Sequence, residues 1–349
     1  MSGGVDSSVA ALLTKETGDE CIGATMKLFH NEDIGVKREK TCCSLDDVED
    51  ARNVCYRMGI RYYVFNFSER FKEDVMDRFV DAYEHGATPN PCIDCNRYLK
   101  FDKMFQRMRE LEYDYIVTGH YARVEYDEEK GRYLLKKAVD DTKDQSYVLY
   151  SLTQEQLANT CFPLGDYSKT EIRKIAEEQG FFNAHKHDSQ DICFIPDGDY
   201  KKFLENNSNL KPKKGNIVNS KGEILGKHTG LYNYTIGQRK GIGLAAPEAL
   251  YVTKIDAEKN VVYVGYKDKL FSKSLVLENV NWSYPQAEKE FEALVKIRYN
   301  MKAVSAIVKI KNDCTEIEFL EEVSAVAKGQ ACVIYSKKDG HLLGGAFVK

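Results

Sequence analysis

The chain begins with a loop rich in glycine and serine at residues 2–8 (SGGVDSS), and an apolar helical pattern, VAALL, follows it without a break. Adjacent glycines let backbone N–H groups turn toward an anion, and the positive end of the helix faces the same point. The loop lacks the G-x-x-x-x-G-K-S/T pattern, so no lysine is placed to follow a γ-phosphate in transfer. It therefore predicts a pyrophosphate site and a reaction that releases pyrophosphate from ATP. The residues predicted to hold ATP in this loop are Ser2, Gly3, Gly4, Val5, Asp6, Ser7 and Ser8.

Strand and helix patterns alternate after this loop. Strand patterns at residues 20–29, 61–67 and 115–119 are separated by helix patterns at 45–58, 69–85 and 101–111, with a loop at 88–96. A capping box formed by Ser168 and Glu171 begins a further helix. This alternation predicts an α/β fold with a doubly wound parallel sheet. Ligands bind at the carboxyl ends of such strands, where Met26, Gly119 and the opening loop are expected to meet.

The pattern changes near residue 204. Residues 206–214 are rich in Asn and Lys and predict a linker, and short segments bounded by glycine follow. Alternating strands recur from about residue 271 to the end, which is typical of a compact β-barrel. We expect an ATP-binding catalytic domain at 1–204, a small β-rich central domain at 205–268 and a C-terminal β-barrel at 269–349.

Composition describes an ordinary globular protein, with 43% hydrophobic and 30% charged residues. The net charge of −4 argues against a uniformly basic surface for nucleic acid. A local basic loop at 237–241 (GQRKG) is flanked in sequence by Lys211, Lys213 and Lys214. The chain has no apolar run of membrane-spanning length and no leader pattern, so we expect a cytoplasmic protein without a membrane partner.

Ten cysteines in such a chain predict free thiols, metal ligands or catalytic groups rather than disulfides. Cys92 and Cys95 form a C-x-x-C pair in the loop at 88–96, which two prolines stiffen, and Cys193 follows a cationic segment that would lower the pKa of its thiol. The pair could instead be half of a zinc site completed by Cys42 and Cys43, or a redox dithiol. Cys92, Cys95 and Cys193 could also hold an iron–sulfur cluster of the 4Fe–4S type with one open position.

Five motifs occur in a fixed order: the opening loop, TPNPCIDCN at 88–96, TGHY at 118–121, KDQSY at 143–147 and DSQDICFI at 188–195. With them the chain resembles the tRNA-specific 2-thiouridylases over nearly its whole length. The resemblance implies an enzyme that replaces the C2 oxygen of the wobble uridine of tRNA with sulfur, using ATP with Mg²⁺ and a persulfide. It also implies an ATP pyrophosphatase domain, a central tRNA-binding domain and a C-terminal barrel. A cysteine desulfurase or sulfur-relay protein would be the partner that supplies sulfur.

The resemblance carries over to individual residues. It implies that Cys95 is the catalytic nucleophile and Cys193 the persulfide carrier, and that the two form a disulfide when sulfur is released, which an external reductant must reset. Met26 and Gly119 would contact the adenosine. The residues that it places against tRNA are Asn90, Pro91, Cys92, His120, Lys143, Asp144, Gln145, Arg298, Tyr299 and Gln330.

The chain departs from the family at two points. The family has a β-strand before the phosphate loop, whereas Met1 directly precedes Ser2 here, so we expect a sheet without its first strand and a chain shortened from a longer one. Cys92 stands where many members carry an aspartate, and we expect it to be a supporting residue or a spare thiol. Two other functions stay open: an ATP pyrophosphatase that adenylates a small substrate, and a non-catalytic tRNA- or metal-binding form.

Overall fold

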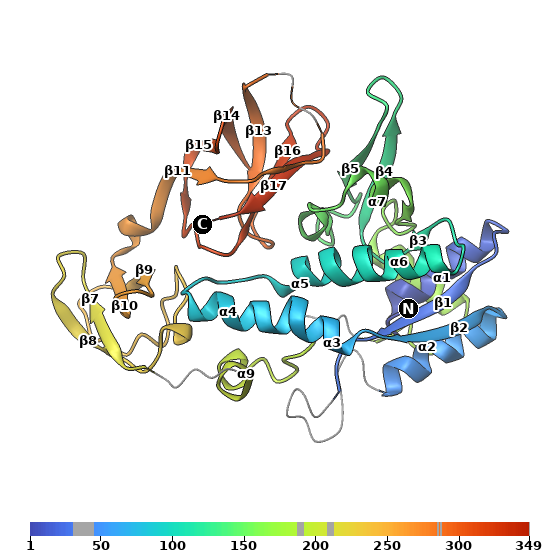
Figure 1. Ribbon diagram of the computed structural model, residues 1–349, viewed down its shortest axis with the longest axis horizontal. Helices are drawn as coiled ribbons and strands as arrows, with labels where there is room; N and C mark the ends of the chain where they lie inside the picture. The colour runs from blue at the N-terminus through green and yellow to red at the C-terminus, as the bar shows by residue number, and fades with distance from the viewer. Residues whose placement is uncertain (31–44, 187–191, 208–212, 285, 287, 349) are drawn as a thin grey trace. The chain divides into compact units, whose positions relative to one another are not determined.

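The computed structural model describes residues 1–30, 45–186, 192–207, 213–284, 286 and 288–348. The chain divides into two compact units, each built from several stretches of sequence. The first comprises Met1–Met76, Cys92–Gly198 and Gly340–Leu342, and the second Asp77–Pro91, Asp199–Asp339 and Leu343–Lys349. Figure 1 labels their helices and strands.

The first unit has the predicted α/β character. Its helices are α1 (Val5–Glu16), α2 (Leu45–Met58), α3 (Ser68–Phe71), η1 (Lys72–Asp77, which continues into the second unit), α5 (Pro91–Asp94), η2 (Cys95–Lys103), α6 (Met104–Glu110), η3 (Ser146–Leu149), α7 (Gln154–Ala158) and α8 (Lys169–Glu178). Its strands are β1 (Ile22–Lys27), β2 (Arg61–Asn66), β3 (Ile116–Val117), β4 (Ala122–Asp127), β5 (Arg132–Lys137) and β6 (Thr160–Cys161). The α/β class is confirmed.

The strands of this unit form pairs. β1 and β2 are parallel with Ile22 opposite Arg61, β3 and β6 are parallel, and β4 and β5 form an antiparallel hairpin. Within the described ranges, no ladder joins the two parallel pairs into one sheet. Met1, directly before the phosphate loop, lies beside β1, where its amino group donates to the Ala24 carbonyl and its carbonyl accepts from Thr25 Oγ1 at 2.8 Å.

The core of the first unit lies around α1. Val5 and Val9 of α1 are buried with Ile172 and Ala176 of α8 and with Val54 of α2. α8 begins at the predicted capping box, in which Ser168 and Glu171 each bond the other's backbone N–H. Because α8 packs against α1, this box also sets the position of the first residues of α8 relative to the phosphate loop.

The segment at 88–96 differs from its predicted loop. Residues 87–90 have no regular secondary structure, but Pro91 begins α5, and η2 and α6 follow it without interruption to Glu110. Proline suits the first position of a helix, because the N–H that it lacks would have no partner there. Cys92 and Cys95 therefore lie at the start of a long helical run and not in a stiff loop.

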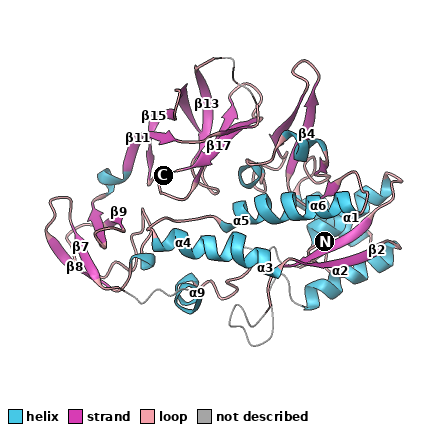
Figure 2. Ribbon diagram, viewed as in Figure 1, coloured by secondary structure: helices cyan, strands magenta, loops and turns pink. Residues whose placement is uncertain are grey.

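The second unit is rich in β-structure (Figure 2). Its helices are α4 (Arg78–Glu84), α9 (Tyr200–Asn207), η4 (Leu231–Asn233) and η5 (Lys267–Leu270). A four-stranded sheet has the order β8-β7-β10-β9 and contains β7 (Gly215–Val218), β8 (Ile224–His228), β9 (Tyr251–Asp256) and β10 (Val261–Gly265). α4 and α9 pack through Tyr83 and Tyr200, whose rings stack with centroids 5.2 Å apart.

The C-terminal part is a curled antiparallel sheet of seven strands in the order β11-β15-β14-β13-β16-β17-β12 (Figure 1). Its strands are β11 (Phe271–Leu277), β12 (Asn281–Trp282), β13 (Glu290–Lys296), β14 (Val304–Ile310), β15 (Thr315–Ser324), β16 (Ala331–Ser336) and β17 (Leu342–Phe347). A bridge joins Leu277 of β11, the first strand of this order, to Val348, which directly follows β17, the last strand but one. Alternate side chains such as Val295, Val308 and Ile317 fill the inside of the curl. The predicted β-barrel architecture is confirmed.

Candidate active site

The phosphate loop wraps around the N-terminus of α1. Gly3 has φ +70°, and a Cβ there would lie 2.5 Å from the backbone oxygen of Asp47, so the position requires glycine. Gly4 is the N-cap residue and provides no side chain to cap the helix. The first N–H groups of an α-helix have no carbonyl partner within it, so this end of α1 can receive an anion. The hydroxyls of Ser7 and Ser8 both donate to the Gly4 carbonyl at 3.0 Å and stabilise the turn.

The carboxylate of the loop, Asp6, is held by two residues from distant parts of the chain. Lys169 Nζ donates to its two oxygens at 2.7 and 2.8 Å, and the Tyr121 hydroxyl donates to Oδ1 at 2.8 Å. The side chain of Lys169 is only 11% exposed. This cation offsets the charge of Asp6, which would otherwise repel a polyphosphate. The sequence shows no sign of this role, because Lys169 lies within the capping box of Ser168 and Glu171, which predicts only where a helix begins.

Two further side chains, Asn183 and Lys186, stabilise the phosphate loop through hydrogen bonds. Asn183 is buried, and its Nδ2 donates to the Gly3 carbonyl and to Ser8 Oγ, both at 3.0 Å. Lys186 Nζ donates to Asp47 at 2.6 Å and Asp50 at 2.8 Å and lies 3.5 Å from the Gly3 carbonyl. Burial lowers the pKa of Lys186, but its hydrogen bonds to the two carboxylates outweigh burial and raise it overall. Lys186 is therefore a permanent cation at the phosphate loop.

Gly119 lies against the phosphate loop, as the sequence predicts. A Cβ on Gly119 would come within 2.8 Å of the backbone of Asp6 and Ser7, so only glycine permits this approach. Met26 lies near the carboxyl end of β1, opposite Phe65 of β2. Their proposed contacts with adenosine stay predictions.

The two cysteines of the C-x-x-C pair differ in exposure. Cys92 is exposed in α5, whereas Cys95, the first residue of η2, is partly buried. Burial raises the pKa of the Cys95 thiol to about 11; Lys100 acts in the opposite direction, while Cys92 and Asp94 raise the pKa further. At neutral pH the Cys95 side chain is therefore a protonated thiol. Because the thiolate is the nucleophilic form, the reactivity of Cys95 depends on neighbouring groups that stabilise the negative sulfur.

Cys193 lies in a turn and is partly exposed. The next residue, Phe194, is buried and meets the ring of Phe71 edge-on at 5.6 Å. Phe71 belongs to α3, which contacts η2, the helix that begins at Cys95. Both predicted catalytic thiols thus belong to segments of the first unit that pack around α3. The preceding motif residues 188–191 lie outside the described residues.

His120 is enclosed by protein. It is 7% exposed and packs against the rings of Phe101 and Phe162. Its Nδ1 lies 2.7 Å from Thr118 Oγ1 and its Nε2 lies 3.4 Å from Lys100 Nζ. Burial first and Lys100 second hold the pKa of His120 well below its usual value, so the ring is neutral. Its predicted contact with tRNA stays a prediction, since both ring nitrogens face protein atoms here.

The segment of Lys143, Asp144 and Gln145 has a structural role in the fold. Asp144 is 6% exposed, and its carboxylate accepts hydrogen bonds from the backbone N–H groups of Ala138 and Ser146 and from the Ser146 hydroxyl. Gln145 accepts from the backbone N–H of Tyr121 at 3.0 Å. Lys143 is partly exposed, and it is the member of this group whose charge RNA could reach most directly.

The second unit contains the other residues predicted to contact tRNA. Gln330 Nε2 donates to the Thr88 carbonyl at 2.6 Å, which ties the barrel to the irregular segment at 87–90. Arg298 donates to the carbonyls of Ala325 and Ile236, and Ile236 lies in the segment between η4 and β9. Tyr299 lies beside Lys296, whose ammonium is 5.4 Å from its ring centre. Direct contacts of these residues with RNA stay predictions.

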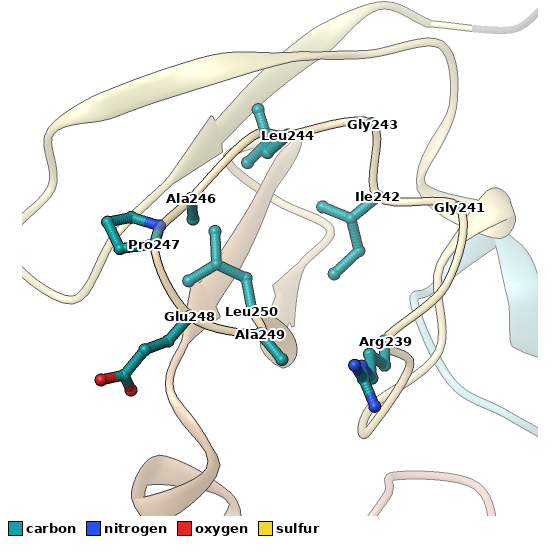
Figure 3. Close-up of a pocket in the computed structure, with 10 residues that line it drawn as sticks. All are labelled: Arg239, Gly241, Ile242, Gly243, Leu244, Ala246, Pro247, Glu248, Ala249 and Leu250. Atoms are coloured by element: carbon teal, nitrogen blue, oxygen red, sulfur yellow. The ribbon is translucent and has the colours of Figure 1, made fainter.

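Two surface pockets of about 350 Å³ each lie in the central part of the second unit. The loop that follows the predicted basic segment encloses one of them, which Arg239, Leu244 and Leu250 line (Figure 3). The other is lined by the four lysines Lys213, Lys214, Lys227 and Lys259. The predicted local positive charge is therefore present in this part, while Lys211 lies outside the described residues.

Metal ligands do not gather in the part of the chain that the structure describes. There, no group of three or more His, Cys, Asp or Glu side chains is arranged to hold a metal ion. Cys42 and Cys43, the possible partners in a zinc site, lie outside the described residues. None of the described helices is long and apolar enough to cross a bilayer.

Comparison with known proteins identifies the family. Residues 1–197 match the tRNA methyl transferase HUP domain, 201–266 the tRNA methyl transferase PRC-barrel domain and 272–348 the aminomethyltransferase beta-barrel domain. The chain is 48% identical over 348 residues to the tRNA-specific 2-thiouridylase MnmA 1 of Thermoanaerobacter sp. (strain X514), which covers 99% of this chain and 95% of that protein. It is 47% identical over 352 residues to the tRNA-specific 2-thiouridylase MnmA of Clostridioides difficile (strain 630), covering 100% of this chain and 96% of the relative. The chain belongs to the tRNA-specific 2-thiouridylase family.

Proposed function

We propose that this chain is a sulfurtransferase that replaces the C2 oxygen of the wobble uridine of tRNA with sulfur and consumes ATP. The observation that carries the proposal is the combination, within the first unit, of a pyrophosphate-type loop at α1 with the thiols of Cys95 and Cys193. Neither feature alone would specify this reaction. The loop accounts for ATP, and the thiols account for sulfur.

The reaction divides into activation and transfer. The uridine C2 oxygen attacks the α-phosphate of ATP, pyrophosphate leaves, and the oxygen becomes part of a good leaving group. The N-terminus of α1, with Lys186 behind it, would stabilise the departing pyrophosphate. Mg²⁺ would be held chiefly by the phosphates of ATP and would neutralise their charge, because Asp6, the carboxylate of the loop, already bonds Lys169 and Tyr121.

Transfer then uses both thiols. Cys193 carries a terminal sulfur as a persulfide, and AMP leaves when that sulfur bonds to C2. The Cys95 thiolate attacks Sγ of Cys193, so the S–S bond of the persulfide breaks as a Cys95–Cys193 disulfide forms and the thiolated base is released. Alternatively, Cys95 attacks first and releases sulfide, which then adds to the base. In either order two electrons are lost from the thiols, and an external dithiol must restore them.

Other reactions explain fewer of these features. The matched family models are described by methyl transfer, yet a methyltransferase needs neither a pyrophosphate loop nor a second thiol. An ATP pyrophosphatase that adds nitrogen would use the loop but not Cys95 and Cys193. A cluster held by Cys92, Cys95 and Cys193 would replace the persulfide chemistry, and visible absorption of anaerobically purified protein tests for such a cluster.

The sulfur for the proposed reaction would come from a cysteine desulfurase or a sulfur-relay protein, and the chain would act in the cytoplasm.

The experiment measures 2-thiouridine by nucleoside mass spectrometry after incubation with Mg-ATP, unmodified tRNA, a dithiol and a cysteine desulfurase with its substrate. We expect product from the parent chain, and loss to background in Cys95→Ser and Cys193→Ala. Cys161→Ser is the matched control, since Cys161 is also a free thiol of the first unit and has no part in the proposal. Equal product from all four proteins would refute the roles of both thiols.

A further inference from the structure

The helix that begins at Cys95 has an unusual hydrogen-bonding pattern. η2 is a π-helix over Cys95–Lys103, and the backbone N–H of Met104 bonds the carbonyl of Leu99, five residues earlier. In an α-helix, five residues turn through about 500°, so Cys95 and Lys100 would point about 140° apart. The wider π-helical turn brings residues five apart toward the same side. The helix type therefore turns the Lys100 side chain toward the side that carries Cys95.

The ammonium of Lys100 is held in place by His120. His120 Nε2 lies 3.4 Å from Lys100 Nζ, and because an ammonium can only donate, Nε2 is the acceptor and the ring proton lies on Nδ1. Nδ1 then donates to Thr118 Oγ1 at 2.7 Å. The neutral ring is fixed between Phe101 and Phe162 and so provides a rigid acceptor for the lysine.

Lys100 is the cation that acts on the Cys95 thiol. Burial raises the pKa of that thiol, Cys92 and Asp94 raise it further, and Lys100 lowers it. His120, being neutral, contributes no charge. Among the described residues, the amino group of Met1 also interacts with Lys100. Within the described part of the chain, Lys100 is thus the cation that offsets the effects of burial, Cys92 and Asp94 on the partly buried Cys95 thiol.

We propose that Lys100, held by the neutral His120, is a positioning residue that stabilises the thiolate of Cys95. The step is a proton loss: the S–H bond of Cys95 breaks, the proton passes to water, and the ammonium faces the negative sulfur. This proposal rests on the proposed function only in assigning the Cys95 thiolate to sulfur transfer. Formation of the thiolate itself requires neither ATP nor tRNA.

The test measures alkylation of Cys95 by iodoacetamide between pH 7 and 10 in the full chain, with modified residues assigned by peptide fragmentation. In Lys100→Gln we expect Cys95 to react about three- to tenfold more slowly at pH 8.5, equivalent to a rise of about half to one pKa unit. Lys100→Arg keeps the charge and should recover most of the parent rate. Cys161 is the internal control, because burial alone raises its pKa.

An unchanged rate for Cys95 in Lys100→Gln would overturn the proposal. So would equal slowing of Cys95 and Cys161, or a failure of Lys100→Arg to react faster than Lys100→Gln. If Lys100→Gln does not fold, His120→Leu replaces it, since leucine cannot accept from the ammonium; slower Cys95 alkylation supports the proposal and an unchanged rate refutes it. A chain that shows the expected alkylation but makes no 2-thiouridine would contradict the proposed function alone.

Discussion

At the scale of single residues, Asp6 depends on a cation that arrives from far along the chain. Lys169→Met should leave a partly buried carboxylate without its cation and lower the free energy of unfolding by about 1–3 kcal/mol. Tyr121→Phe keeps the ring and removes one hydrogen bond, so we expect a loss of about 1 kcal/mol. Denaturant unfolding measures both, and ATP affinity should fall more in Lys169→Met. A larger effect of Tyr121→Phe on either quantity would contradict this ranking.

Two buried histidines make stability depend on pH. Burial lowers the pKa of His120 well below 6.5 and also lowers that of His228. The unfolded chain binds protons at these rings as pH falls below about 6.5, while the folded chain does not, so folded stability decreases there. We expect the free energy of unfolding to fall between pH 7.5 and pH 5.5, by at most about 1.4 kcal/mol per pH unit for each ring.

The matched variant for this pH dependence is His120→Gln, which cannot gain a proton at the ring position. Unfolding curves at the two pH values should differ less for this variant than for the parent chain. An identical difference in the two proteins would show that His120 is protonated in the folded state as well.

At the scale of elements, the start of α8 is tied to the phosphate loop. Ser168 caps this helix, and the next residue is Lys169, the partner of Asp6. Ser168→Ala should cost about 1 kcal/mol of unfolding free energy. It should also weaken ATP binding, because Lys169 loses its fixed position.

Thr153→Ala is the control for the cap. Thr153 forms an equivalent capping box with Gln156 at the start of α7, where Gln154 bonds the backbone of Tyr133 in β5. We expect Thr153→Ala to lose about as much free energy of unfolding as Ser168→Ala but to keep the ATP affinity of the parent chain, measured by calorimetry. Equal ATP affinity of Ser168→Ala and Thr153→Ala would show that the position of α8 does not affect ATP binding at the phosphate loop.

At the scale of the whole molecule, each compact unit is assembled from separate stretches of the chain. In the second unit, Thr88 is held by the barrel: its N–H donates to the Lys328 carbonyl at 2.8 Å, and its carbonyl accepts from Gln330. Gly329 has φ +87°, and a Cβ there would lie 2.9 Å from the Cβ of Ala87. The barrel thereby sets the path of residues 87–90, which lead directly through Asn90 into Pro91 and Cys92, the three residues here that the family resemblance places against tRNA.

Gly329→Ala should displace this segment and weaken tRNA binding while ATP affinity is retained. Gly222→Ala is a matched control, since Gly222 has φ +85° with no atom within 4 Å of the added Cβ. Both variants carry the backbone strain of about 1 kcal/mol, but only Gly329→Ala adds a steric clash. Equal tRNA affinity of the two variants, measured by filter binding, would contradict the role of this contact.

Local motifs could be recognised from the sequence because their chemistry depends on neighbouring residues. The phosphate loop, the capping box at Ser168 and the alternating strands of the barrel are all contained in short segments. The start of α5 was missed because Pro91 was interpreted as part of a stiff loop, although proline is also suited to the first position of a helix. The π-helical pattern of η2 has no sequence signal that would distinguish it from an α-helix.

The sequence by itself determined the α/β and β-barrel classes, the phosphate loop and the identity of the thiols, since each follows from side-chain period or from residues adjacent in the chain. Only the tertiary structure decided that Lys169 pairs with Asp6, that Lys186 and Asn183 support Gly3, and that His120 holds Lys100. These partners are separated by up to 183 residues along the chain. Long-range packing selects them, and no local pattern in the sequence encodes which distant side chains will meet.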